Sequence, residues 1–282
     1  MQTKKKAWIN LIVLIATLVV NGLGGTGLIN DSSQSEVSGE FQTLITPAGF
    51  AFSIWSLIYG LLVISMIVMI VKSEDGYYRK AIEKITPLFW LSSVLNMAWI
   101  VAFSYYQIGL STIFIFGYLL SLTRIVQILL AMHEPKRWLL PVTFGLNAGW
   151  LFIATVVNIS AFLVQIEWNG FGIADTTWAI LMLVISVALC AFVLWRLKNA
   201  AFPLPIAWAY FAIFSERMNA GNASAVGYLS IGGMVVLLLL AGLTSKKTII
   251  LCFQNSLLNR NFVLWFFFLL RYNREKVGGV EN

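Results

Sequence analysis

Charge is the scarcest property of this chain. Only 11% of its 282 residues are charged, whereas 59% are hydrophobic, and the mean hydropathy is +0.84. A soluble domain carries about 25% charged residues, so a globule of this size could not hide so much apolar surface from water. The composition excludes a soluble globular protein and indicates an integral membrane protein whose first partner is the lipid bilayer.

Cysteine and histidine are almost absent. Cys190 lies inside an apolar run, Cys252 lies in the C-terminal tail, and His133 is the sole histidine. Cysteines so placed predict no disulfide framework, and the lack of a Cys/His cluster argues against a metal site. The sequence also contains no nucleotide-binding loop and no Ser–His–Asp set, so we predict no catalytic residue, no required cofactor and no nucleic-acid partner.

Long apolar runs fill most of the chain. In lipid every backbone polar group must be paired internally, and continuous rather than alternating runs indicate helices. Most of the runs reach the ~20 residues that a bilayer requires, the weakest being the seventh, which carries Pro203 and Pro205 in its first turns. We predict an all-α, polytopic membrane bundle of eight helices, at about 7–28, 48–72, 86–106, 110–132, 138–163, 177–197, 200–216 and 223–244.

The basic residues favour one side of the predicted bundle. That side receives Lys4–Lys6, Lys72, Arg79, Lys80, Lys84, Lys136, Arg137, Arg196, Lys198, Lys246 and Lys247. The opposite loops contain a single basic residue, Arg217. The positive-inside rule then places the N-terminus and Lys247 in the cytoplasm, and we expect the membrane to be the plasma (inner) membrane.

Both ends of the chain leave an alternative open. Lys4–Lys6 followed by an apolar run resemble a signal peptide, but "NGLGGTGLIN" is a poor cleavage site, so we favour a retained first helix. In the tail, residues 248–282, two apolar pieces too short to cross the bilayer are separated by polar residues. We predict a cytoplasmic interfacial segment with Trp265 at headgroup level. A ninth helix is the alternative.

The stretch "TPAGFAFSIWSLIYGLL", residues 46–62, is richer in aromatic residues than a membrane helix needs. Trp55 and Tyr59 lie four residues apart, on one helical face, and Phe52 lies near that face. At the usual helical rise Trp55 is about 12 Å deeper than Pro47, and a tyrosine hydroxyl deeper still needs a partner. A lined pocket and an aromatic belt with ordinary packing are both open.

Two further predicted helices combine tryptophan with asparagine on one face. Asn96 and Trp99 lie three residues apart, and intervals of three, four and four align Asn147, Trp150, Ala154 and Asn158. Asparagine within a span is costly unless it bonds a neighbouring helix or faces a cavity, and both interpretations stand. Flat aromatic walls with a few amides suit a large, flat, mostly apolar ligand.

These motifs resemble those of the tryptophan-rich sensory protein or translocator protein (TspO/MBR) family. The matching residues are Pro47, Trp55, Tyr59, Leu95, Asn96, Trp99, Phe103, Trp150, Ala154, Thr155 and Asn158. The resemblance covers about residues 7–165, which make up the family's five-helix core. Gly49 stands where the family has its first tryptophan, Ile58 replaces a leucine and Leu146 a proline, and the chain continues for three more helices, as in a long, divergent branch.

The resemblance implies a pocket near the first outer loop that binds porphyrins and other hydrophobic ligands, in proteins that are often homodimers. It divides the chain into a core (1–165), three additional helices (166–247) and the tail (248–282). A porphyrin or haem-like ligand is then expected. The ligand contacts that residues and resemblance together predict are Phe50, Phe52, Trp55, Tyr59, Asn96, Trp99, Asn147, Trp150, Ala154 and Asn158.

Three smaller features complete the predictions. Arg124, within the fourth span, is a functional candidate by default. It snorkels to the cytoplasmic interface, pairs with a structural partner, or contacts an anionic ligand. Glu216 and Arg217 are predicted to form an exposed pair at the outer end of the seventh helix. Gly232 and Gly233 would allow close approach of another helix.

Binding of a hydrophobic, aromatic ligand such as a tetrapyrrole, in a sensory or regulatory role, is the function these features favour. A transporter or permease subunit for a lipophilic solute is the first alternative, and a porphyrin-degrading enzyme is the second. No acidic residue lies inside a predicted span, which disfavours a proton-coupled carrier because such relays need titratable groups in the membrane. No evident general acid or base supports the enzyme.

Overall fold

The computed structural model describes residues 2–134, 136–220 and 225–245, and over these ranges the regular structure is helical. The long helices are α1 (Thr3–Gly25), α3 (Ile54–Val71), α4 (Gly76–Ser104), α5 (Ile108–Leu130), α6 (Leu139–Gln165), α7 (Asp175–Leu197), α8 (Pro203–Asn219) and Ala225–Ser245. Three short helices lie in connections: α2 (Gln34–Glu40), η1 (Gly49–Ser53) and η2 (Gly170–Gly172). The tail, with Cys252 and Trp265, lies outside the described residues.

Seven of the described helices are long and apolar enough to cross a membrane. They confirm the predicted polytopic helical membrane bundle, and η1 and α3 together form one of these spans, Gly49–Val71. The helix predicted to be the weakest, α8, is not among the seven. It has 17 residues, about 25 Å at 1.5 Å per residue, which is shorter than the hydrocarbon core of a typical bilayer.

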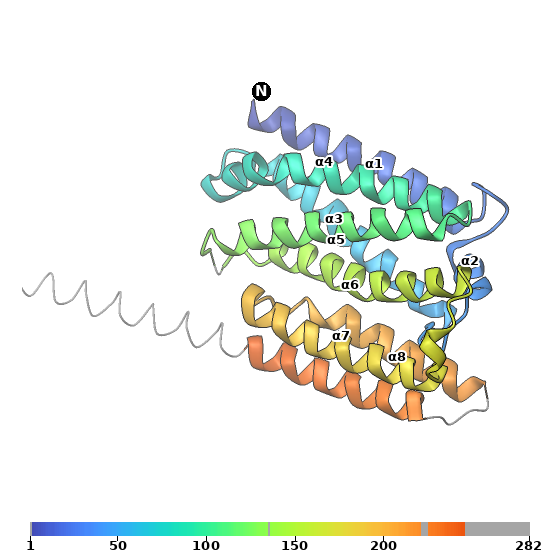
Figure 1. Ribbon diagram of the computed structural model, residues 1–282. Helices are drawn as coiled ribbons and strands as arrows, with labels where there is room; N and C mark the ends of the chain where they lie inside the picture. The colour runs from blue at the N-terminus through green and yellow to red at the C-terminus, as the bar shows by residue number, and fades with distance from the viewer. Residues whose placement is uncertain (1, 135, 221–224, 246–282) are drawn as a thin grey trace, which may run out of the picture.

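Five helices form a closed ring in which each packs against the next, in the order α1, α3, α6, α5, α4 and back to α1. Figure 1 shows α1 and α4 along one side of the molecule and α7, α8 and helix 225–245 layered along the other. The added helices meet the ring chiefly where α8 packs on α6. The ring corresponds to the predicted five-helix core.

Two glycines on α6 let the turn before α8 approach closely. A Cβ at Gly149 would overlap the carbonyl oxygen of Phe202, and a Cβ at Gly145 would lie 2.5 Å from Asn199 Oδ1. Asn199 Nδ2 donates to the carbonyl of Pro141, 2.8 Å away. The spacing of four residues puts both glycines on one face, the arrangement that allows backbones to touch in membrane helix pairs.

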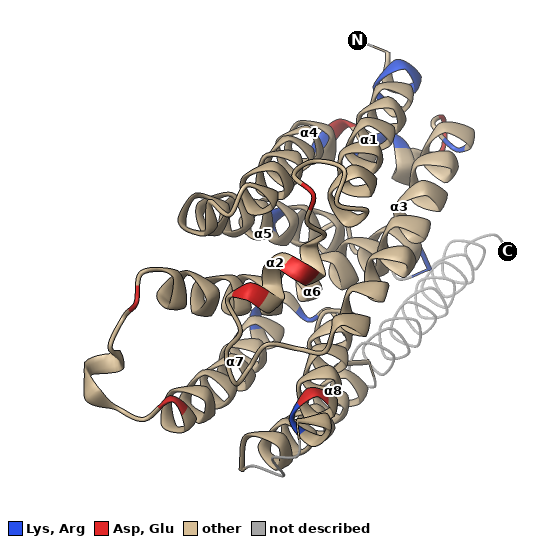
Figure 2. Ribbon diagram, turned by 90° about the vertical axis from the view of Figure 1, so that its right-hand side faces the viewer, with Lys and Arg blue, Asp and Glu red and all other residues tan. Residues whose placement is uncertain are grey.

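The connections gather at two ends of the bundle, as Figure 1 shows. One end, here named the α2 end, also holds the connections 105–107 and 166–174. Its acidic residues are Asp31, Glu36, Glu40, Glu167, Asp175 and Glu216. Figure 2 views the molecule from this end, with Asp and Glu in red and Lys and Arg in blue. The described lysines and arginines, apart from Arg217, lie in the connections or helix turns towards the opposite end. This separation of charge is the observation from which the cytoplasmic orientation is predicted.

The prediction of an exposed pair at Glu216 and Arg217 is wrong. Arg217 is only 8% exposed, and its Nε has no hydrogen-bond partner among the described residues. Glu216 accepts instead from Gln42 Nε2, 3.3 Å away. The last turn of α8 is covered because helix 225–245 packs against it: a Cβ at Gly227 would lie 3.3 Å from the Cβ of Arg217.

The two adjacent glycines of helix 225–245 have different surroundings. A Cβ at Gly233 would lie 2.5 Å from the ring of Tyr210 on α8, whereas a Cβ at Gly232 would meet nothing within 4 Å. Gly233 therefore provides the predicted close approach. Gly232 does not, because it lies about 100° away around the helix.

Candidate functional site

A cavity of about 240 Å³, here named the α2 pocket, lies at the α2 end between α1, α2, η1 and α3. Its lining residues are Asn21, Gly25, Ser33, Gln34, Ser35, Phe52, Trp55 and Tyr59. The aromatic residues come from η1 and α3, and the amides and hydroxyls come from α1 and the start of α2. The pocket thus combines an apolar aromatic wall with a neutral polar wall.

The aromatic wall is centred on Trp55. The rings of Trp55 and Tyr59 stack, with centroids 4.9 Å apart and planes 12° from parallel. This is the pairing that their four-residue spacing on one helix predicts. Trp55 also contacts Trp99 of α4 at 6.3 Å and, edge-on, Trp150 of α6 at 6.1 Å. Phe52 meets the same Trp150 at 6.3 Å, so the wall is supported from two other helices.

The polar wall is held by a capping box at the start of α2. The Ser33 hydroxyl accepts from the Glu36 N–H, and the Glu36 carboxylate accepts from the Ser33 N–H at 2.7 Å. These bonds satisfy two helix-end donors reciprocally, and the hydrogen bond from the Ser33 backbone lowers the pKa of Glu36. They fix the backbone from which Gln34 and Ser35 line the pocket.

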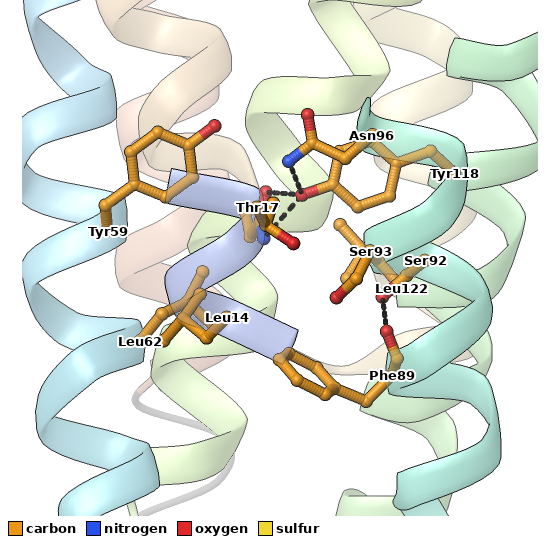
Figure 3. Close-up of a pocket in the computed structure, with 11 residues that line it drawn as sticks. Leu14, Thr17, Tyr59, Leu62, Phe89, Ser92, Ser93, Asn96, Tyr118 and Leu122 are labelled. Carbon is orange, nitrogen blue, oxygen red and sulfur yellow. Dashed lines mark hydrogen bonds between the residues drawn. The ribbon is translucent and has the colours of Figure 1, made fainter. Parts of the chain in front are cut away.

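A second, much smaller cavity shares the Tyr59 side chain with the α2 pocket. This inner cavity is lined by Leu14, Thr17, Tyr59, Leu62, Phe89, Ser92, Ser93, Asn96, Tyr118, Leu122 and Asn147, and Figure 3 shows them converging. Its volume is about 10 Å³, roughly what one water molecule needs. Of the described residues, Tyr59 is the one that lines both cavities.

A chain of hydrogen bonds runs from Tyr59 through all five helices of the ring. The Tyr59 hydroxyl donates to Asn21 Oδ1 at 2.7 Å, and Asn21 Nδ2 donates to Asn96 Oδ1 at 3.2 Å. Asn96 Nδ2 donates to the Tyr118 hydroxyl at 3.3 Å, and Asn147 Nδ2 donates to the same oxygen at 3.2 Å. Buried amides thereby obtain the partners that they need in a membrane interior.

The structure divides the ten predicted ligand contacts among four places. The α2 pocket is lined by Phe52, Trp55 and Tyr59, and the inner cavity is lined by Tyr59, Asn96 and Asn147. Behind Trp55 pack the rings of Trp99 and Trp150. Neither cavity is lined by Phe50, Ala154 or Asn158. The sequence predicted one shared cavity. The structure instead divides these residues between the α2 pocket and the inner cavity, which share Tyr59 as a lining residue.

Asn158 and Phe50 have other partners. Asn158 Oδ1 accepts from Trp99 Nε1 at 3.2 Å, and Asn158 Nδ2 donates to Thr112 Oγ1 at 2.7 Å, so Asn158 joins α6 to α4 and α5. This is the interhelical bonding that the sequence left open. The ring of Phe50 packs edge-on against Trp208 of α8, with centroids 5.4 Å apart.

Arg124 lies outside both cavities. Its side chain is exposed and donates to Gln127 Oε1 at 3.1 Å, one turn further along α5. That position gives it no contact with the residues lining either cavity. The placement is compatible with a side chain that reaches towards the headgroups.

Several lining residues were not among the predicted contacts. Asn21 and Tyr118 lie inside predicted spans, where a buried polar side chain is itself a signal. Ser33–Glu36 has the Ser-x-x-Glu pattern of a capping box, which indicates the start of α2. These signals are local and were readable, whereas the assembly of Ser33, Gln34 and Asn21 around one cavity depends on tertiary packing.

The lining groups limit the chemistry of the site. Over the described residues, both cavities are lined by aromatic rings, aliphatic side chains, hydroxyls and amides, with no Lys, Arg, His, Cys, Asp or Glu. No group of three or more His, Cys, Asp or Glu in the described part of the chain could hold a metal ion. Such a site stacks on flat surfaces and hydrogen-bonds neutral polar groups.

Comparison with protein-family models identifies the family of the chain. A family model described as "TSPO-like protein" matches residues 7–243. The match runs from α1 into helix 225–245, so it includes both cavities and the three helices beyond the ring. No curated protein and no solved structure matches the chain.

Proposed function

The chain belongs to the TSPO-like protein family, and from this premise we propose that it binds a flat, hydrophobic, aromatic ligand of the tetrapyrrole type in the α2 pocket, in a sensory or regulatory role. The observation that carries the proposal is the stacked pair Trp55 and Tyr59 in the wall of a cavity of about 240 Å³. Aromatic residues with a few convergent polar groups are the usual lining of a small-molecule site.

The ligand would lie with one face on the aromatic wall and one edge at the polar wall. Trp55 is only 8% exposed, so a flat ring would pack against the small part of the indole that faces the pocket and would add to its stack with Tyr59, as aromatic side chains stack on nucleic-acid bases. The amides of Asn21 and Gln34 and the hydroxyl of Ser33 supply neutral donors and acceptors opposite. This combination favours polarisable rings over flexible aliphatic chains, because a flat ring gains contact area without losing internal freedom.

The size of the pocket restricts how a tetrapyrrole fits. Drug-sized ligands occupy clefts of roughly 300–1,000 Å³, so a cavity of about 240 Å³ takes one edge of such a ring rather than the whole. No described lining residue is cationic, and ring carboxylates would therefore remain towards water at the mouth. We expect a porphyrin dimethyl ester to bind at least as tightly as the corresponding dicarboxylic acid.

The hydrogen-bond chain beneath the pocket supports a sensory role. Tyr59 belongs to the pocket wall and also starts the chain of bonds that reaches Asn147 on α6. A ligand that moves the Tyr59 ring changes a bond network shared by five helices. Coupling between two sites needs an element with two arrangements, whose equilibrium is biased by events at both sites. Among the described residues, the lining of both cavities offers no carboxylate, imidazole or thiol, which weighs against catalysis.

Equilibrium binding of a porphyrin panel to the purified protein tests the proposal, with the change Trp55→Leu. The leucine stays apolar but cannot stack, so we expect affinity to fall by about 1–3 kcal/mol, or about 5- to 150-fold. The matched control is Trp195→Leu, because the Trp195 ring on α7 is 67% exposed and lines neither cavity. Equal affinities of the two variants, or no saturable binding by the wild-type protein, would refute the proposal.

A further inference from the structure

The residues of η1 are here named the mouth of the α2 pocket, and they are hydrogen-bonded to α8, one of the helices beyond the ring. The segment η1 (Gly49–Ser53) contributes Phe52 to the lining and leads directly into Trp55. Its other side packs on α8, which lies far along the chain: Trp208 Nε1 donates to the carbonyl of Ala51 at 3.0 Å, across a sequence separation of 157.

Two further contacts fix the same segment. The N–H of Ala48, the residue before η1, donates to the carbonyl of Ala212 in α8 at 3.2 Å. The ring of Phe50 contacts those of Trp208 and Phe211 at centroid distances of 5.4 and 6.0 Å. Backbone and side chains of the mouth therefore depend on one face of α8, and Ala51 is fully buried there.

The opposite side of η1 touches the polar wall. A Cβ at Gly49 would lie 2.8 Å from Ser35 Oγ, so η1 and the start of α2 are in close contact. Any outward movement of η1 changes the gap between the polar wall and Trp55. The segment η1 is thus in contact with α8 and with the polar wall of the pocket.

We propose that α8 sets the size of ligand that the α2 pocket admits, with Trp208 as the positioning residue that holds η1. The inference rests on the proposed function for the existence of a ligand, and on the contacts above for the role of Trp208. In this proposal α8 braces the pocket through its contacts with η1 and the residue before it. A cavity below the usual size range is what a braced mouth would produce.

The test is Trp208→Phe, which keeps an aromatic ring against Phe50 but removes the N–H donor to the Ala51 carbonyl together with part of the indole ring system. Trp178→Phe is the matched control, because Trp178 Nε1 donates to the carbonyl of Gly170 at 2.8 Å, so the same kind of bond is lost away from the pocket. Amide hydrogen exchange of residues 48–54 needs no ligand. We expect it to be about fivefold faster in Trp208→Phe, the factor for one lost hydrogen bond, and unchanged in Trp178→Phe.

Ligand selection is the second measurement. Affinities for 2-naphthol and for a porphyrin dimethyl ester are compared in both variants. With η1 released, the ratio of porphyrin to naphthol affinity should rise by about fivefold in Trp208→Phe and stay constant in Trp178→Phe. Phe50→Leu, which removes the ring contacts from the η1 side, should shift exchange and ratio in the same direction as Trp208→Phe.

The outcomes separate the two proposals. Exchange of residues 48–54 equal in the Trp208 and Trp178 variants overturns the positioning role. Faster exchange with an unchanged affinity ratio also overturns it, since Trp208 would then be a structural contact without effect on selection. If the wild-type protein binds neither ligand, the proposed function fails, and exchange alone decides whether Trp208 holds the mouth.

Discussion

Replacing Tyr118 by phenylalanine removes one oxygen from the centre of the bond network. That hydroxyl accepts from Asn96 Nδ2 and Asn147 Nδ2 and donates to Asn147 Oδ1, over distances of 3.2 to 3.4 Å. Asn96 keeps its bond from Asn21, but Asn147 keeps none of its described hydrogen bonds. The substitution therefore leaves the buried amide of Asn147 without a described partner, and the amide of Asn96 loses its bond to Tyr118.

The expected cost follows from two opposing effects. An unsatisfied buried amide costs about 1–3 kcal/mol, whereas interhelical hydrogen bonds in a membrane protein average only about 0.6 kcal/mol. The inner cavity, about 10 Å³, adjoins the lost hydroxyl, so the enlarged space can admit a water that restores part of the bonding. We expect Tyr118→Phe to lower the free energy of unfolding by about 1–2 kcal/mol.

Equilibrium unfolding in mixed micelles of detergent and sodium dodecyl sulfate, followed by circular dichroism, measures this difference. Tyr228→Phe is the matched control, because Tyr228 in helix 225–245 is 61% exposed and should change stability by less than about 0.5 kcal/mol. If the two variants unfold at the same detergent fraction, the network contributes nothing measurable to the fold, and the argument that buried amides need these partners fails.

Three other outcomes follow from particular contacts. Gly233→Leu should disrupt packing against Tyr210 and lower the free energy of unfolding by about 1–3 kcal/mol. Gly232→Leu, whose side chain would point into open space, should unfold like wild type. Equal effects of the two substitutions would contradict the conclusion that Gly233 alone provides the close approach to α8. Hydrogen bonding lowers the folded-state pKa of Glu36, so the stabilisation that ionised Glu36 gives to α2 is present above the unfolded pKa and is lost as pH falls through the lowered one. The protection of the α2 amides, taken relative to the intrinsic exchange rate at each pH, should therefore fall in acid, and Glu36→Gln should abolish that dependence. Arg124→Lys should leave porphyrin affinity unchanged, because Arg124 contacts neither cavity; a tenfold loss, about 1.4 kcal/mol, would show the ligand contact that the geometry does not provide.

The helices were predictable because their apolar runs are continuous and bounded by charged loops. Spacing along a helix also predicted correctly that Trp55 and Tyr59 share a face. Spacing does not give volumes, and so the division into two cavities at Tyr59 could not be foreseen.

Contacts between distant segments were equally hidden. The burial of Arg217 depends on helix 225–245, and the partner of Phe50 lies on α8, neither of which local sequence reveals. Ligand identity, membrane orientation and self-association stay predictions.

The glycine face of α6 has a consequence for shortened forms of the chain. Gly145 and Gly149 have the spacing that commonly pairs two membrane helices, and here the segment 199–202 already covers them. A chain ended after residue 165 would keep the complete ring of five helices. It would expose to lipid a groove shaped for another backbone, and the donor N–H of Ala48 would lose its acceptor. Truncation would thereby turn an internal helix contact into an exposed face that can pair with a second copy of the chain. A form of this protein lacking its last helices should therefore self-associate more readily than the whole chain.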